Sequence, residues 1–95
     1  MQTSQNDKYT KKEILLRTVG KIIKEKRKQK GKGILLLAYE YDIPSSSLDK
    51  VEKGLRDPQL TTLWRIANAL DMTFGEFIAT LEQKLPKDFQ LIEEK

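Results

Sequence analysis

The chain has 95 residues, of which 38% are hydrophobic and 34% are charged, so one small domain with a single core is expected. It contains no cysteine and no histidine. Disulfides, metal sites built on these residues and nucleophile–histidine pairs are therefore excluded. The net charge is +4, divided into +8 over residues 1–33 and −4 over residues 34–95. This asymmetry indicates either attraction to a polyanion or simply a solvated lysine-rich helix. We expect no cofactor, no metal and no enzymatic activity.

The sequence contains no candidate signal or membrane segment. Its first seven residues are polar, and the longest apolar run, residues 34–38, is much shorter than a membrane span. Together with the lack of cysteine, this pattern predicts a cytoplasmic protein that does not contact a membrane.

The first third of the chain predicts a flexible arm over residues 1–13 and a long helix from about residue 11 to about residue 29. Thr10 and Glu13 have the spacing of a capping box. Gly31 and Gly33 are expected to end the helix, and Gly20 raises the alternative of a second helix start near residue 19. Apolar residues follow the capping box at helical spacing: Ile14, Leu15, Val19, Ile22 and Ile23.

Two short helices are expected next. Residues 34–41 have the length of a strand or a short helix, and the helix is favoured because the rest of the chain offers no partner strand. Residues 42–44 form a break, after which Pro44 begins a helix that ends at Gly54. Ser45 or its neighbours are expected to cap this helix, and Leu48 and Val51 point inward.

The last third predicts a loop, two helices and a tail. After the loop at residues 55–60, Thr61 or Thr62 is expected to cap a fourth helix, and Thr73 a fifth helix that Pro86 ends. The tail, residues 83–95, is expected to be a docked arm, a strand or a helix. The two inward stripes are Leu63, Ile66, Ala67 and Leu70, then Phe74, Phe77, Ile78 and Leu81.

The second and third helices form the pattern that carries function. Each has about eight residues, a three-residue turn containing Ile43 joins them, and the small Ala38 permits a close crossing. This is the pattern of a helix-turn-helix, whose second helix enters the major groove of DNA.

Residues from about 19 to 77 resemble the Cro/phage-repressor family of the xenobiotic-response-element type. The resemblance is carried by Val51-Glu52-Lys53-Gly54, Arg56-Asp57-Pro58, and the run from Leu60 through Leu63 and Ile66-Ala67 to Leu70. It implies an all-α, five-helix, lambda-repressor-like domain over residues 14–82, with an N-terminal helical extension and a short C-terminal tail. It further implies sequence-specific binding of double-stranded DNA as a homodimer and regulation of transcription, as a repressor.

The resemblance also implies roles for individual residues. Arg27 and Glu52 would form an ion pair between the first and third helices, where an unpaired carboxylate on the inner face would be costly. For each residue that is expected to contact DNA, the alternative is that its side chain simply belongs to the solvated helix surface. The residues placed at DNA are Ser45, Ser46, Ser47, Asp49 and Lys50 on the reading helix, and Lys53, Arg56 and Lys32 at phosphates.

Apolar residues depart from the family pattern at the start of the second helix. Ile34, Leu35 and Leu36 stand where the family has polar residues, and three consecutive helical positions cannot all face one side. At least one is expected to be exposed or covered by another segment. This departure supports an alternative function as a protein-interaction module, such as an antitoxin binding a toxin.

The homodimer is expected to form through the fifth helix and the residues after it. The interface residues would be Ile78, Leu81 and Leu85. The alternative is that these side chains only close the core of one subunit.

Overall fold

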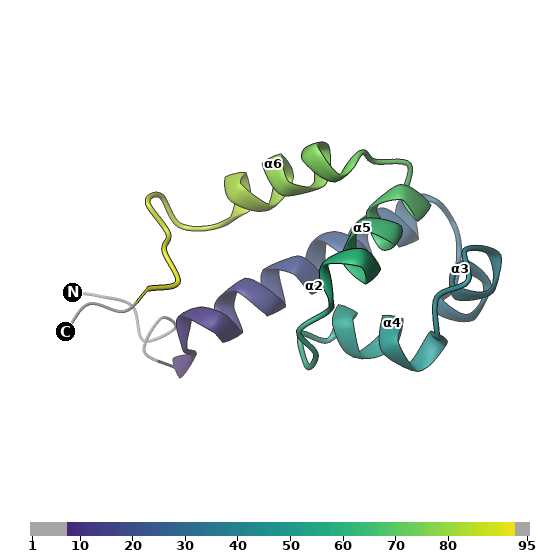
Figure 1. The fold of residues 1–95 in the computed structure, drawn as a ribbon, viewed down its shortest axis with the longest axis horizontal. Coiled ribbons are helices and arrows are strands. Elements are labelled where there is room, and N and C mark those ends of the chain that lie inside the picture. The colour runs from purple at the N-terminus through teal and green to yellow at the C-terminus, as the bar shows by residue number, and fades with distance from the viewer. Residues whose placement is uncertain (1–7, 93–95) are drawn as a thin grey trace.

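The computed structural model describes residues 8–92 and contains helices but no strands in that range. All five predicted helices are confirmed (Figure 1). The first seven residues of the expected arm and residues 93–95 of the expected tail lie outside the described residues. The helices are α2 (Lys11–Gln29), α3 (Ile34–Glu40), α4 (Ser45–Glu52), α5 (Leu60–Ala69) and α6 (Phe74–Lys84).

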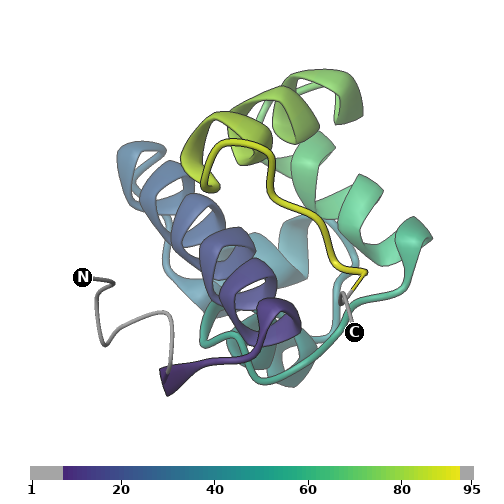
Figure 2. The same cartoon turned by 90° about the vertical axis from the view of Figure 1, so that its left-hand side faces the viewer.

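Helices α4 and α6 pack directly against the long helix α2, α3 packs on α4, and α5 packs on α6. In Figure 1, α6 lies above α2 and α4 lies below it, and Figure 2 confirms that α5 covers the side of the core opposite α2. The core between them is built from aliphatic side chains around Phe77, which is fully buried. Its other fully buried large residues are Ile22, Ile23, Leu37, Leu48, Val51 and Ile66.

Helix starts agree with the capping prediction at two positions. Thr10 and Thr73 both accept a hydrogen bond from the amide three residues on, and Glu13 and Glu76 accept from the cap amides in return. The expectation that Thr61 or Thr62 caps α5 is wrong, because the helix begins earlier, directly after Gln59. A cap must have extended backbone, and Gln59 has it, with φ −62° and ψ 153°.

The expected serine cap of α4 is also wrong. Its cap residue is Pro44, and no side chain bonds the first amides of the helix. The serines that follow belong to the helical first turn, so their hydroxyls are left for other partners.

Replacing Thr73 with alanine should lower the free energy of unfolding by about 1 kcal/mol, because the amide of Glu76 loses its acceptor. Thr61→Ala is the matched control, since the Thr61 hydroxyl caps nothing. It should change the stability by less than about 0.5 kcal/mol. Urea denaturation followed by circular dichroism measures both, and equal losses would contradict the assignment of the caps.

Gly31 has the role expected from the sequence, whereas the alternative raised by Gly20 is wrong. α2 continues through Gly20 without interruption, so there is no second helix start. Gly31, with φ +75°, follows the cap residue Lys30 and turns the chain out of the helix, as predicted.

Lys30 joins the end of α2 to α5 and to the turn after α3. Its Nζ donates to the hydroxyl of Tyr41 at 3.0 Å and to the carbonyl of Ala69 at 2.6 Å, and lies 3.4 Å from Asp71 Oδ2. The hydrogen bond to Tyr41 raises the pKa of Lys30, burial lowers it, and Asp71 raises it further. The net result is a raised pKa, so the ammonium group stays charged and the three segments stay joined.

The C-terminal tail is a docked arm rather than a strand or a helix. It runs back toward the start of α2 (Figure 2), where Lys11 Nζ donates to the carbonyl of Ile92 at 3.4 Å. Phe89 is half-buried, and residues 86–90 line a cavity of about 270 Å³ together with Tyr9 and Ile14. Two expected boundaries therefore move: residues 11–13 belong to α2 rather than the arm, and residues 83–84 belong to α6.

Candidate nucleic-acid interface

Helix α4 presents one polar face to solvent because its other face is fixed in the core. Leu48 and Val51 are 0% and 1% exposed. Ser46 and Lys50 are exposed, while Ser45, Ser47 and Asp49 are half-buried. The side chain of Lys50 has no ion pair or hydrogen bond among the described residues, so it is available to a ligand.

The loop after α4 brings an arginine back onto the helix. Gly54 adopts a positive φ of 74°, which reverses the chain, and Arg56 Nη1 then donates to Ser47 Oγ at 2.8 Å. A guanidinium and a hydroxyl therefore form one pair at the surface. Such a pair can donate hydrogen bonds to phosphate oxygens or to acceptors on bases.

Two other residues that were expected to contact DNA form ion pairs within the protein. Lys53 Nζ lies 3.1 Å from Asp49 Oδ2, one turn apart on α4, and both groups are exposed. Lys32 forms an ion pair with Glu40, a residue of α3. These pairs reduce the positive charge of α4 and of the start of α3, and being at the surface they exchange easily for phosphate.

A buried ion pair holds α4 against α2. Arg27 is 8% exposed, and its Nε and Nη2 donate to the two carboxylate oxygens of Glu52 at 2.5 and 2.9 Å. Nη1 of Arg27 also donates to the carbonyl of Lys32 at 2.9 Å. The hydrogen bond to Glu52 raises the pKa of Arg27, against the opposing effect of burial. The ion pair expected from the sequence is thus present, and it links α2, α4 and the segment before α3.

The surplus of positive charge lies beside α4 rather than on it. Arg17 of α2 contacts the loop after α4, since a Cβ on Gly54 would lie 2.9 Å from its Cγ. Three exposed lysines continue from Arg17 on the same face of α2, four, seven and eleven residues along. We call this row the basic ridge: Arg17, Lys21, Lys24 and Lys28.

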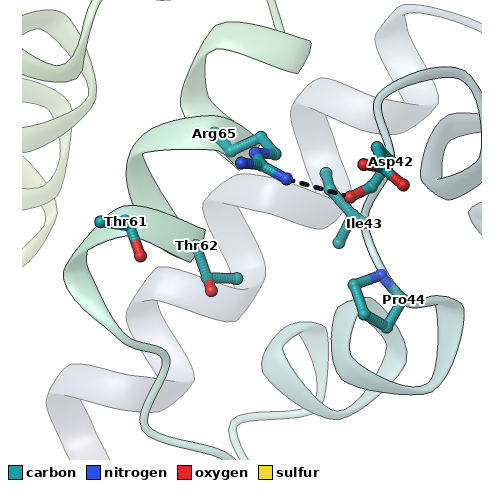
Figure 3. Close-up of a pocket in the computed structure, with 6 residues that line it drawn as sticks. All are labelled: Asp42, Ile43, Pro44, Thr61, Thr62 and Arg65. Carbon is teal, nitrogen blue, oxygen red and sulfur yellow. Dashed lines mark hydrogen bonds between the residues drawn. The ribbon is translucent and has the colours of Figure 1, made fainter.

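A small polar hollow joins the turn before α4 to α5 (Figure 3). Arg65 Nη1 donates to the carbonyl of Asp42 at 3.2 Å, and Asp42 has a positive φ of 58°. The hollow has a volume of about 90 Å³, much less than the roughly 300 Å³ of a small-molecule site. The hollow is therefore too small for a ligand of that size, and the hydrogen bond from Arg65 across it holds the turn against α5. Its lining residues are Asp42, Ile43, Pro44, Thr61, Thr62 and Arg65.

The apolar residues at the start of α3 are exposed, as the spacing predicts. Leu35 and Leu36 are 74% and 48% exposed, and Tyr39 on the same helix is 85% exposed. Ile34 alone of the three consecutive residues packs against the core. We call Leu35, Leu36 and Tyr39 the α3 patch.

The three residues expected at a dimer interface differ in how deeply they are buried. Leu81 is 7% exposed and belongs to the core of its own subunit, as the alternative expects, so little of its surface is left for a partner. Ile78 and Leu85 are half-buried and pack against that core. The reason is that α6 turns most of its apolar stripe toward α2 and α5.

Sequence reasoning missed Trp64, which it left out of the inward stripe of α5. Trp64 is 49% exposed, and Leu60, one turn before it, is 62% exposed. Their spacing of four residues was the available signal, because it places a second apolar stripe on a helix whose first stripe already fills the core.

Comparison with known proteins identifies a family and a relative. The family model described as "Helix-turn-helix" matches residues 23–77, which is more than half of the chain. The chain is 30% identical over 74 residues to the "HTH-type transcriptional regulator SutR" of Escherichia coli (strain K12). The matched part covers 78% of this chain but 42% of that protein. No solved structure matches.

Two further features of residues 8–92 concern membranes and metal ions. No helix in residues 8–92 is long and apolar enough to cross a membrane. In the same range, no three His, Cys, Asp or Glu side chains cluster in a way that would hold a metal ion.

Proposed function

Because this chain belongs to the Cro/C1-type helix-turn-helix family, we propose that it binds specific sites in duplex DNA as a homodimer and represses transcription in the cytoplasm. The observation that carries the proposal is the exposed polar face of α4, held in place by the Arg27–Glu52 pair and flanked by the basic ridge. A second support is the relative from Escherichia coli, which is a transcriptional regulator.

The geometry supports a division of tasks between positioning and reading. The basic ridge and Arg56 attract and contact phosphates, since they are exposed cations beside the C-terminal end of α4. Lys50 and the serines of α4 face the base edges. Lys50 donates to guanine, whereas serine hydroxyls both donate and accept and therefore discriminate weakly.

The double variant Lys50→Ala, Arg56→Ala should bind DNA less tightly and with a smaller dependence on salt. Removing the phosphate contact of Arg56 should lower the slope of log K against log salt by about 1, and removing both cations should lower the affinity at about 0.1 M salt by roughly 10-fold. The measurement is fluorescence anisotropy of a labelled random duplex over a range of salt concentrations.

The control for this variant removes the same charge from the opposite side of the molecule. Lys84→Ala, Lys87→Ala changes residues at and after the end of α6, which lies across α2 from α4 (Figure 1). It should leave the salt slope nearly unchanged. Equal effects of the two variants would contradict the placement of DNA on α4. No binding by the unmodified protein at tens of micromolar in about 50 mM salt would contradict DNA binding itself.

A second candidate function rests on the α3 patch. Three large exposed apolar side chains on one short helix are unusual on a monomer surface, and such patches commonly bind another protein. The candidate is a protein-interaction module, such as an antitoxin that binds a toxin through Leu35 and Leu36, since Ile34, which the sequence also suggested, packs against the core. If the unmodified protein binds DNA and Leu35→Ser binds it equally well, the first function is favoured. If the unmodified protein does not bind DNA, the second function is favoured.

A further inference from the structure

The exposed face of α5 carries a second apolar surface, distinct from the α3 patch. Leu60 and Trp64 lie one turn apart and are 62% and 49% exposed. The indole of Trp64 stacks on the ring of Phe74, with centroids 4.6 Å apart and planes at 8°. The stacking fixes the orientation of Trp64, so that this surface is formed before any partner arrives.

A groove of about 520 Å³ lies beside these two side chains. Tyr41, Asn68 and Ala69 line it together with Leu60 and Trp64. Most of its lining is apolar. Among the described residues, the only charged side chain that lines it is Arg65, whose guanidinium is bonded to the carbonyl of Asp42 (Figure 3). The side chains of Leu60 and Trp64 therefore project beside a groove on an almost uncharged surface. We call Leu60, Trp64 and this groove the α5 face.

We propose that the α5 face is where two copies of the chain meet, an inference that rests on the homodimer of the proposed function. A two-fold interface joins a surface to itself, so it needs a projection and a matching hollow on the same patch. The α5 face has both, because Leu60 and Trp64 stand beside the groove. An aromatic anchor entering a pocket near the centre is also the usual source of binding energy.

Charge and shape favour a second copy as the occupant. Each copy carries a net charge of +4, so two copies repel each other most strongly where their basic ridges meet. The α5 face lies across the core from α2, so two copies that meet there keep their basic ridges apart (Figure 2). A two-fold axis running from the α6 side to the α4 side leaves both α4 helices facing the same way (Figure 1).

Trp64 is the single tryptophan of the chain, which makes it a direct reporter of this interface. Sedimentation equilibrium establishes whether the full chain dimerises, and tryptophan emission with acrylamide quenching is measured over the same concentrations without DNA. We expect a dimer whose formation shifts the emission to the blue and lowers the quenching constant about two-fold or more, as burial of a half-exposed indole requires.

Leu60→Glu tests the face without disturbing the stacked Trp64. It should weaken the dimer about 30-fold or more, because it places a carboxylate in a desolvated apolar contact. Leu35→Glu, at a site 74% exposed on the α3 patch, is the matched control and should leave the dimer intact. Ile78→Gln probes α6 in the same assay, and thermal unfolding confirms that each variant is folded.

The outcomes separate the interface from the proposed function. A dimer with an accessible Trp64, or one that only Leu35→Glu or Ile78→Gln dissociates, would overturn the α5 face while the homodimer stands. A monomer at every concentration would overturn both the face and the homodimer. DNA binding is measured separately by anisotropy, so a loss of DNA binding with an intact Trp64-buried dimer would overturn the proposed function and leave the α5 face standing.

Discussion

Replacing Glu52 with alanine should lower the free energy of unfolding by about 3–5 kcal/mol. The variant leaves the guanidinium of Arg27, 8% exposed, without the two carboxylate oxygens that lie 2.5 and 2.9 Å from its nitrogens. A domain of this size is stable by about 5–15 kcal/mol in all, so the loss removes a large share of its stability. Urea denaturation followed by circular dichroism at 222 nm measures the change.

The double variant Arg27→Met, Glu52→Leu is the control for this prediction. Removing both partners leaves no buried charge, and apolar side chains of similar volume often replace a buried pair without loss. The hydrogen bond from Arg27 to the carbonyl of Lys32 is lost, which costs about 1 kcal/mol. The double variant should therefore be more stable than Glu52→Ala. A loss of less than about 1 kcal/mol in Glu52→Ala would show that the pair is screened by solvent.

The pH dependence of this contribution follows from the direction of the pKa shift. The pKa of Arg27 is raised in the folded protein by its hydrogen bond to Glu52. A raised pKa stabilises the fold fully below the unfolded pKa, and the contribution is lost only as the pH rises through the folded pKa. Arginine titrates above about pH 12, so the contribution of Arg27 is constant across the neutral range.

Local signals predicted the helices well because they act within one turn of chain. The capping boxes at Thr10 and Thr73 involve atoms three residues apart, and both are formed in the structure. The break at residues 42–44 also needs no distant contact, since proline limits the preceding helix. The order of the five helices and the type of four of them follow from such signals, whereas α3 was predicted from the lack of a partner strand, and several boundaries shift slightly.

The errors arose where distant segments decide the local structure. Thr61 and Thr62 are good caps by residue type, yet the chain enters α5 at Gln59. For Leu81 the spacing left both an interface position and a core position open, and the packing of α6 on the rest of the core leaves it 7% exposed. Spacing gives the width of an apolar stripe, whereas the crossing of helices decides which part of it stays exposed.

The candidate site was predictable in its elements but not in its internal pairing. The positions of Ser46 and Lys50 on the outer face of α4 follow from the inward spacing of Leu48 and Val51. The bond from Arg56 to Ser47 depends on how the loop closes after α4, which no spacing rule specifies. Surface pairs of this kind also depend on rotamers, so the sequence leaves them open.

Gly20 is the position where a local rule and the packed structure give opposite predictions. Replacing a mid-helix glycine with alanine ordinarily stabilises a helix by about 1 kcal/mol. In this fold a Cβ at Gly20 would lie 2.2 Å from the carbonyl oxygen of Glu52 and 2.7 Å from that of Val51. These are backbone atoms of α4, so relief requires α2 and α4 to move apart. The movement would also stretch the Arg27–Glu52 pair.

We therefore expect Gly20→Ala to lower the free energy of unfolding by about 3 kcal/mol, because overpacking against backbone exceeds the gain in helix propensity. Gly75→Ala is the matched control, since its Cβ would meet only Thr73 Oγ1 at 3.9 Å, an ordinary contact. That variant should raise the stability by about 0.5–1 kcal/mol. Urea denaturation of both variants gives the signs. A stabilising Gly20→Ala would mean that α2 and α4 lie further apart than this contact requires, and that the reading helix is less firmly supported.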